Sequence, residues 1–167
     1  MSENQKKIWI TGASIGIGKA VAEKFAKEGW KVAVSARRKE LLDELAKNEN
    51  ITSFPLDVTN QSQIKNVFKS ILSEFGDLDL CLFSSGTYEP KDEQSIDPDK
   101  IKNVINVNFL GVIDCVKAVE DYFKHKKSGH ISIVSSIAGY RGLPNSSGYG
   151  PSKAALTNFI FNKIFFH

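Results

Sequence analysis

The sequence predicts an α/β fold, in which a doubly wound parallel sheet carries helices on both faces. Short apolar segments alternate along the chain with segments of helical length and amphipathic pattern, which is typical of consecutive βαβ units. Residues 78–83 are apolar almost without interruption, as expected of a strand buried on both faces of a parallel sheet. Right-handed crossover connections make a doubly wound sheet the natural result.

Turn residues and helix caps divide the chain into elements. We expect a helix to begin after Thr59, as its N-cap, and another after Asp97, with Pro98 in the first helical position. The polar stretches 84–95 and 137–147 are expected to be loops. The predicted strands are 7–11, 31–35, 51–56, 78–83 and 130–135. The predicted helices are 17–28, 39–47, 60–75, 98–123 and 149–167.

Size and composition indicate one globular domain over residues 1–167, since 41% of the residues are hydrophobic and 25% are charged. The net charge of +3 is spread along the chain, which argues against nucleic acid or an anionic membrane as a partner. Cys81 and Cys115 lack metal-ligand spacing and are expected to be reduced core residues, with no metal site. No signal-peptide pattern and no membrane-spanning run is found, so a cytoplasmic protein is expected.

A glycine-rich turn, TGASIGIG at 11–18, joins the first predicted strand to the first helix. Gly12, Gly16 and Gly18 suit a tight turn, close approach of the backbone to a pyrophosphate, and close packing of helix on strand. The helix N-terminus offers free N–H groups to the phosphates, so the context favours a dinucleotide site over a plain glycine turn. A P-loop that binds nucleoside triphosphates, with the pattern GxxxxGK(S/T), is disfavoured. Ala20 replaces the required Ser or Thr, and Gly12 lies one residue too far upstream of Gly18.

The end of the second predicted strand bears on the choice of cofactor. NAD-binding chains carry Asp or Glu here, where the carboxylate binds the ribose 2′-hydroxyl. This chain carries Ala36, Arg37 and Arg38 instead. Two guanidinium groups can bind a 2′-phosphate, so the sequence predicts NADP(H) in preference to NAD(H). The alternative is a solvated basic turn without a ligand.

Tyr149 and Lys153 have the spacing YxxxK at the start of the last predicted helix. Residues four apart share a helix face, and an ammonium near a phenol stabilises the phenolate. The pair is therefore suited to general acid–base catalysis. The spacing alone occurs by chance in many helices, but here it follows a fifth strand whose carboxyl end should face the cofactor crevice.

Together these features resemble the classical short-chain dehydrogenase/reductase family, and the resemblance spans nearly the whole chain. It is carried by the 11–18 turn, Asp57-Val58, Asn108-Phe-Leu-Gly111, Ser135-Ser136 and Tyr149-x-x-x-Lys153. The family implies a Rossmann-like domain, of which this chain would carry five strands in the order 3-2-1-4-5 and lack the sixth and seventh. It also implies an oxidoreductase that interconverts an alcohol and a carbonyl on a small-molecule substrate, by hydride transfer with a nicotinamide cofactor, which the arginines predict to be NADP(H).

The resemblance also implies residue roles. Tyr149 would exchange a proton with the substrate oxygen. Lys153 would stabilise the Tyr149 phenolate and hold the nicotinamide ribose. Ser136 would steady the substrate oxygen, and Asn108 would hold a water in the proton relay. Ser136 fits this role better than Ser135, which looks like a strand residue. The implied cofactor-binding residues are Gly12, Ser14, Ile15, Gly16, Ile17, Gly18, Arg37, Arg38, Asp57, Val58, Gly86, Tyr149 and Lys153. Each of three residues also has a purely structural alternative. Ser136 would stabilise a turn through its hydroxyl, Asn108 would bend a helix through its amide, and Asp57 would cap a helix N-terminus.

The sequence departs from the family pattern in two places. After the fourth strand it has Phe-Ser-Ser-Gly at 83–86 where the family usually has Asn-Asn-Ala-Gly, so amides expected to stabilise the sheet are absent while Gly86 is kept. The family also continues beyond the YxxxK helix with a sixth strand, a substrate-covering segment and a seventh strand, whereas this sequence ends at His167. We therefore expect a C-terminally truncated domain that lacks most of the substrate pocket.

The last predicted helix is apolar on most sides over residues 159–166, which predicts an exposed apolar patch. In the family this helix and the one around Asn108 commonly form a dimer interface, so the full-length form is expected to be a homodimer or homotetramer. The alternative to an enzyme is a catalytically silent fragment that binds a cofactor or a partner protein.

Overall fold

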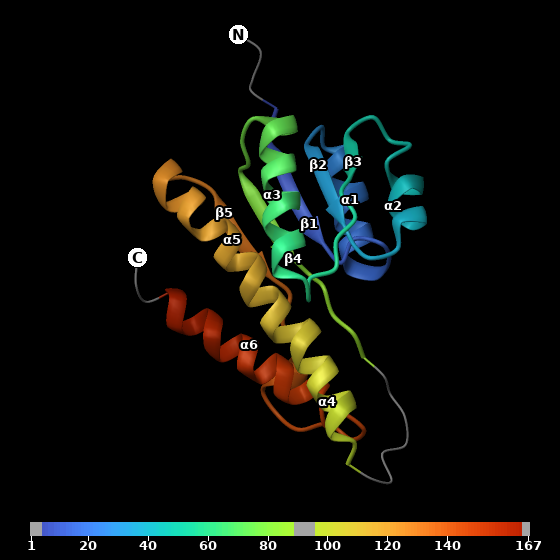
Figure 1. Ribbon diagram of the computed structural model, residues 1–167, viewed down its shortest axis with the longest axis vertical. Coiled ribbons are helices and arrows are strands. Elements are labelled where there is room, and N and C mark those ends of the chain that lie inside the picture. Colours follow the sequence, from blue (N-terminus) through green and yellow to red (C-terminus); the bar gives the residue numbers. More distant parts are fainter. Residues whose placement is uncertain (1–4, 89–95, 165–167) are drawn as a thin grey trace.

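The structure, a computed structural model, describes residues 5–88 and 96–164 (Figure 1). Its strands form a parallel sheet in the order β3-β2-β1-β4-β5, which confirms the predicted fold class and strand order. β1 pairs with both β2 and β4, so the direction of winding reverses beside β1. The strands are β1 (Lys7–Thr11), β2 (Lys31–Ser35), β3 (Ile51–Ser53), β4 (Leu80–Phe83) and β5 (His130–Ile133).

Helices cover both faces of the sheet, with α1 and α2 on one face and α3 and α5 on the other (Figure 1). α4 and α5 are joined through a π-helical turn, η1 (Asn106–Leu110), and a short 3₁₀ turn, η2 (Ile137–Gly139), precedes α6. The α-helices are α1 (Gly16–Lys27), α2 (Lys39–Leu45), α3 (Gln61–Phe75), α4 (Pro98–Ile105), α5 (Gly111–Lys126) and α6 (Tyr149–Ile164).

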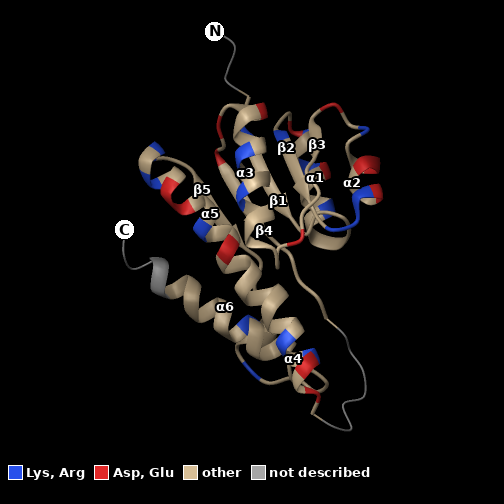
Figure 2. Cartoon of the chain, viewed as in Figure 1, with Lys and Arg blue, Asp and Glu red and all other residues tan. Residues whose placement is uncertain are grey.

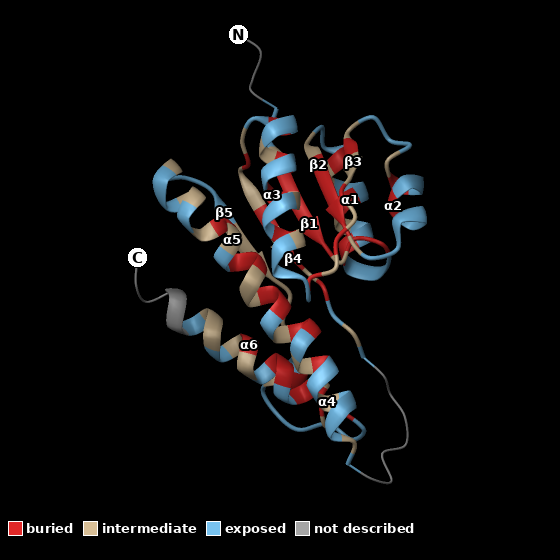
Figure 3. Ribbon diagram, viewed as in Figure 1, coloured by how far each residue is buried: buried red, intermediate tan, exposed pale blue. Residues whose placement is uncertain are grey.

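Alternation along the strands sends side chains into two apolar cores, and β1 and β2 lie buried between the helix layers, whereas β5 at the edge of the sheet is not fully buried (Figure 3). Trp9 points into the core under α3 and α5, where its ring stacks on Phe68 and meets Phe83 edge-on. Ile8 and Ile10 point into the opposite core under α1 and α2. A β1 strand that is buried on both faces gives the glycine turn that follows it a fixed position.

Several local predictions were wrong, and one cap prediction is confirmed. β4 begins at residue 80 instead of 78, and β5 ends at residue 133 instead of 135. Asn60, not Thr59, is the N-cap of α3, because its side chain accepts a hydrogen bond from the Gln63 N–H while the Thr59 N–H and hydroxyl turn back to Asp57. The third strand ends at residue 53 instead of 56, although the N–H groups of Phe54 and Leu56 still donate to the carbonyl oxygens of Val34 and Ala36. Asp97 caps α4 as predicted.

The serine that replaces one of the family's amides still ties the sheet together. Ser84 lies directly after β4, and its hydroxyl donates to the carbonyl oxygen of Thr11 at the end of β1, with an O···O distance of 2.7 Å. The Ser84 N–H also donates to the same carbonyl oxygen. The absence of an amide at this position was expected to weaken the sheet. The Ser84 hydroxyl instead supplies a hydrogen bond between the ends of β4 and β1.

The C-terminal part of α6 is less exposed than its composition predicts. Phe159 and Ile160 pack against the larger core, while Phe161 is 51% exposed. The remainder of the predicted patch, at 165–166, lies outside the described residues. Lys153 is the only charged side chain of α6 within 149–161, and Figure 2 shows the helix almost free of charge.

Within residues 5–88 and 96–164, no helix has both the length and the apolar character needed to cross a membrane. The same residues contain no group of three or more His, Cys, Asp and Glu side chains placed to hold a metal ion. Cys81 and Cys115 are buried as free thiols, and burial raises the pKa of the Cys81 thiol well above its ordinary value.

Candidate active site

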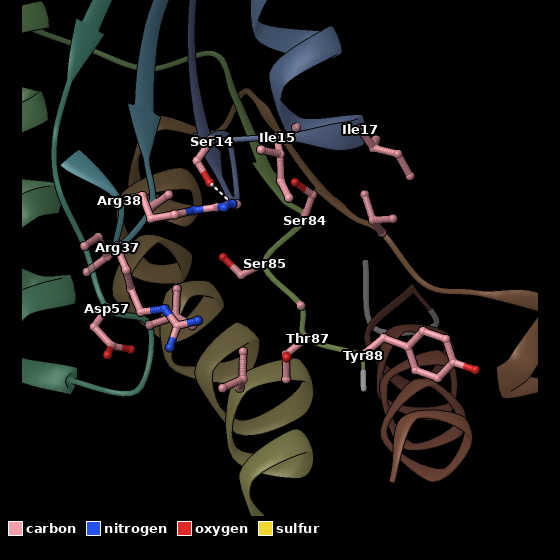
Figure 4. Close-up of a pocket in the computed structure, with 18 residues that line it drawn as sticks. Ser14, Ile15, Ile17, Arg37, Arg38, Asp57, Ser84, Ser85, Thr87 and Tyr88 are labelled. Atoms are coloured by element: carbon pink, nitrogen blue, oxygen red, sulfur yellow. Dashed lines mark hydrogen bonds between the residues drawn. The ribbon is translucent and has the colours of Figure 1, made fainter. Parts of the chain in front are cut away.

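A cleft of about 620 Å³ opens at the carboxyl ends of β1, β2 and β4, where the direction of winding reverses (Figure 4). In open α/β sheets this switch point is the usual place for a ligand. Glycines and small polar residues form much of its lining. The lining residues are Gly12, Ser14, Ile15, Ile17, Gly18, Ala36, Arg37, Arg38, Leu56, Asp57, Val58, Ser84, Ser85, Gly86, Thr87, Tyr88, Val107 and Val134.

The glycines of the turn are required by close backbone contacts. Gly12 has φ +69°, and a Cβ there would lie 2.7 Å from the carbonyl oxygen of Ser84. A Cβ on Gly18 would overlap the carbonyl oxygen of Gly12, so the first turn of α1 lies directly on the chain that enters it. Gly16 has φ +60°, which a non-glycine residue rarely adopts. The turn thus brings bare backbone and a helix N-terminus to the cleft, an arrangement that fits a pyrophosphate.

Two arginines and a carboxylate lie at one end of the cleft (Figure 4). Arg38 donates from Nη2 to the hydroxyl of Ser14, with an N···O distance of 2.9 Å, and this bond joins the end of β2 to the glycine turn. Arg37 is exposed beside it. The Asp57 carboxylate accepts hydrogen bonds from the N–H and hydroxyl of Thr59, so it caps its own turn while lining the cleft.

The Tyr149/Lys153 pair lies on the first turns of α6, as the spacing predicted. Lys153 is only 4% exposed, and its Nζ donates to the carbonyl oxygen of Val134 at 2.8 Å. The same Nζ is 5.8 Å from the centre of the Tyr149 ring. Burial lowers the pKa of the Lys153 ammonium below its ordinary value. The Lys153 ammonium is thus held near the Tyr149 phenol, although removing its charge from water costs free energy.

The two serines after β5 face different ways. The Ser135 hydroxyl is 2.6 Å from the hydroxyl oxygen of Thr157, so Ser135 is engaged with α6. The Ser136 hydroxyl accepts a hydrogen bond from the Ala138 N–H and caps η2. The turn role considered as an alternative for Ser136 is therefore present. An oxygen that accepts only this hydrogen bond can still donate its proton to another group.

Asn108 is fully buried in η1, and its side chain is engaged on both sides. Its Oδ1 accepts from the Thr87 N–H at 2.7 Å, and its Nδ2 donates to the Thr87 carbonyl at 3.0 Å and to the Ser152 hydroxyl at 3.2 Å. Both amide protons are thus committed to the protein. Neither side-chain N–H is left to bind the water that Asn108 was predicted to hold, so that role stays a prediction.

Sequence reasoning missed Tyr88, which lines the cleft at the end opposite the arginines (Figure 4). The centres of the Tyr88 and Tyr149 rings are 4.8 Å apart. The sequence signal was weak, since Tyr88 is one aromatic residue in a polar stretch that was expected to be a loop. Its partner lies 61 residues further along the chain, and only the fold brings the two together.

Replacing Lys153 with methionine is expected to change the pH dependence of stability. Because burial lowers the pKa of Lys153, the native state loses this proton at a lower pH than the unfolded state does. Stability of the unsubstituted protein should therefore rise relative to Lys153→Met as the pH rises from the lowered pKa towards the unfolded value of about 10.4. Urea unfolding at pH values across this window measures the difference.

Lys65→Met is the matched control, because Lys65 is exposed on α3. It should unfold in parallel with the unsubstituted protein at every pH. If the free energy of unfolding of Lys153→Met also runs parallel to that of the unsubstituted protein at every pH, Lys153 is not a buried cation with a lowered pKa.

The fold and the cleft together place the protein in the class of doubly wound α/β domains with a ligand site at the switch point. The family model described as short chain dehydrogenase matches residues 6–162. The chain therefore belongs to the short-chain dehydrogenase family, as the resemblance predicted.

Curated relatives show the same relationship. The chain is 34% identical over 166 residues to dehydrogenase/reductase SDR family member 7 of Mus musculus, with 94% of this chain and 49% of the relative covered. It is 36% identical over 157 residues to oxidoreductase BOA17 of Botryotinia fuckeliana, with 92% and 57% covered. The chain spans about half the length of these relatives.

Solved structures agree with the fold. A short-chain dehydrogenase from Streptomyces avermitilis superposes with a TM-score of 0.87 at 27% identity, covering 95% of this chain and 59% of that one. The protein ElxO with NADP bound superposes with a TM-score of 0.85 at 30% identity, covering 93% and 65%.

Proposed function

We propose that the protein acts as an NADP(H)-dependent oxidoreductase that interconverts an alcohol and a carbonyl group on a small molecule. The observation that carries the proposal is the buried Lys153 cation beside Tyr149, close to a cleft that has two arginines at its far end. Membership of the short-chain dehydrogenase family and the likeness to ElxO with NADP bound support it.

The residues of the cleft fit a dinucleotide. The glycine turn would hold the pyrophosphate through bare backbone N–H groups, and Asp57 and Val58 would contact the adenine. Arg37 and Arg38 would bind a 2′-phosphate, for which the nearby strand end offers guanidinium groups instead of a carboxylate. NADPH, when bound, supplies the hydride.

The protein's own groups would handle the proton. The Tyr149 hydroxyl would donate to the carbonyl oxygen of the substrate during reduction and accept the proton back during oxidation. Lys153 would stabilise the phenolate that this leaves, because its ammonium lies near the ring in a poorly solvated site. Ser136 would donate a hydrogen bond to the same substrate oxygen and hold it in place.

Arg37→Ala tests the cofactor assignment. Loss of a charge-assisted hydrogen bond to the 2′-phosphate should weaken NADPH binding by about 10- to 100-fold. NADH has no 2′-phosphate, so its affinity should change by less than about threefold. Fluorescence titration of both cofactors against both proteins gives the four dissociation constants.

Arg141→Ala is the control, because Arg141 is also an exposed arginine but does not line the cleft. It should leave both affinities nearly unchanged. Equal weakening of NADPH and NADH by Arg37→Ala would overturn the preference for NADP(H).

A further inference from the structure

We propose that Tyr88 is a positioning residue for Tyr149, and that Asn108 serves the reaction by fixing Tyr88 in place. The inference rests on the proposed function, since it concerns the group that transfers the proton. Tyr88 lies on the segment that follows β4, and Asn108 lies in η1, so the arrangement joins three separate parts of the chain.

The segment after β4 is held by the Asn108 side chain, which acts as a clamp on Thr87. Asn108 both accepts from the N–H and donates to the carbonyl of Thr87, at 2.7 and 3.0 Å. Asn108 is itself fully buried and also donates to Ser152 on α6. These hydrogen bonds give the backbone at Thr87 a fixed relation to α6, although no strand pairing holds it.

The clamp presents the next side chain to the acid–base tyrosine. The Tyr88 and Tyr149 rings have centres 4.8 Å apart and an interplanar angle of 47°, within the range of favourable aromatic pairs. Tyr88 is 49% exposed, so it is not needed to fill the core. An exposed ring held against another ring limits the rotamers of its neighbour and shields it from water.

Tyr149 is thus oriented from two directions. Lys153 brings a cation to within 5.8 Å of the ring centre from one helical turn further along α6. Tyr88 contacts the same ring from the β4 side of the cleft. A phenol that is confined in this way keeps its hydroxyl in a narrow range of positions, and small displacements of a reacting group lower reaction rates strongly.

Tyr88→Ala tests the role through turnover. Removing the ring should lower kcat for carbonyl reduction roughly tenfold, the equivalent of one aromatic contact made in the reacting geometry. Because Tyr88 also lines the cleft, kcat is measured at saturating NADPH, where a change in cofactor affinity does not lower the rate. Tyr88→Phe keeps the ring and should recover most of the lost kcat, which a role for the Tyr88 hydroxyl would not allow.

Tyr140→Ala is the matched control, since Tyr140 is 73% exposed on the connection between β5 and α6. It should retain the turnover of the unsubstituted protein. If the unsubstituted protein reduces carbonyls and Tyr88→Ala reduces them equally fast, the positioning role is wrong while the proposed function stands. If the unsubstituted protein binds NADPH and reduces no carbonyl, the proposed function fails.

The ring contact can be measured without any turnover. The protein has only 4 tyrosines, so NMR spectra of ring-labelled tyrosine can be assigned with single Tyr→Phe variants. Tyr88→Leu should shift the Tyr149 ring signals by removing a ring current, and Tyr140→Leu should leave them in place. Asn108→Ala should reproduce part of the shift if the clamp positions Tyr88. Unmoved Tyr149 signals in Tyr88→Leu would overturn the inference.

Discussion

Tyr149→Phe is expected to lower the rate of carbonyl reduction by about 10²- to 10⁴-fold, the usual contribution of a positioned general acid. Phenylalanine keeps the ring that contacts Tyr88 and lies near the Lys153 ammonium, and it removes only the hydroxyl. The effect should therefore fall on kcat, while NADPH binding stays within about threefold. Steady-state kinetics with a panel of ketones, together with a cofactor titration, separates the two.

Tyr122→Phe is the matched control for removal of a hydroxyl. The Tyr122 hydroxyl accepts a hydrogen bond from the Leu78 N–H, and neither residue lines the cleft. It should lower stability by about 1 kcal/mol and leave turnover intact. A Tyr149→Phe protein that reduces ketones at the unsubstituted rate would remove Tyr149 from the chemistry.

Gly18→Ala is expected to abolish most of the affinity for the cofactor. The new Cβ would overlap the carbonyl oxygen of Gly12, which is backbone and cannot rotate away. Either α1 or the turn must move, and both present N–H groups to the proposed pyrophosphate site. We expect NADPH affinity to fall more than about tenfold and overpacking to cost about 1–3 kcal/mol of stability. Fluorescence titration and urea unfolding measure the two effects.

Gly142→Ala is the control for the added methyl group. A Cβ there meets no atom within 4 Å, and Gly142 does not line the cleft. It should bind NADPH normally and unfold at the same urea concentration. Normal affinity in Gly18→Ala would show that the close contact of α1 with the turn is not needed for binding.

The sheet was predictable because each strand carries its own signal. A buried parallel strand is a short apolar run, and the turn residues between the runs mark where helices begin and end. Errors occurred where two neighbouring residues compete for one role. Thr59 and Asn60 are both good N-caps, and Asn60 takes the role because the N–H and hydroxyl of Thr59 are bonded to Asp57.

The candidate site was predictable only as far as motifs reach. The glycine turn and the Tyr149/Lys153 pair have fixed spacings, so the sequence locates them without the fold. The commitment of the Asn108 amide to Thr87 depends on a π-helical turn inside an otherwise regular helical pattern, which leaves no periodic signature. The contact of Tyr88 with Tyr149 depends on that clamp and was therefore out of reach.

The candidate site contains polar side chains whose burial costs free energy. A lysine that is 4% exposed and a fully buried asparagine do not strengthen a core. Hydrogen bonds to Thr87 and Ser152 satisfy the Asn108 amide, and one hydrogen bond to Val134 holds the Lys153 ammonium. Such costly groups beside a cleft favour a site built for proton transfer over a purely structural one.

The most direct test of the central claim is transfer of deuterium from NADPH in which both hydrogens on the reactive carbon of the nicotinamide ring are replaced by deuterium. The protein is incubated with the labelled cofactor and a panel of ketones, and the alcohol products are analysed by mass spectrometry. The account predicts an alcohol that carries one deuterium on its carbinol carbon, formed by the unsubstituted protein and not by Tyr149→Phe. Binding of NADPH without any labelled alcohol, or equal labelling by Tyr149→Phe, would contradict it.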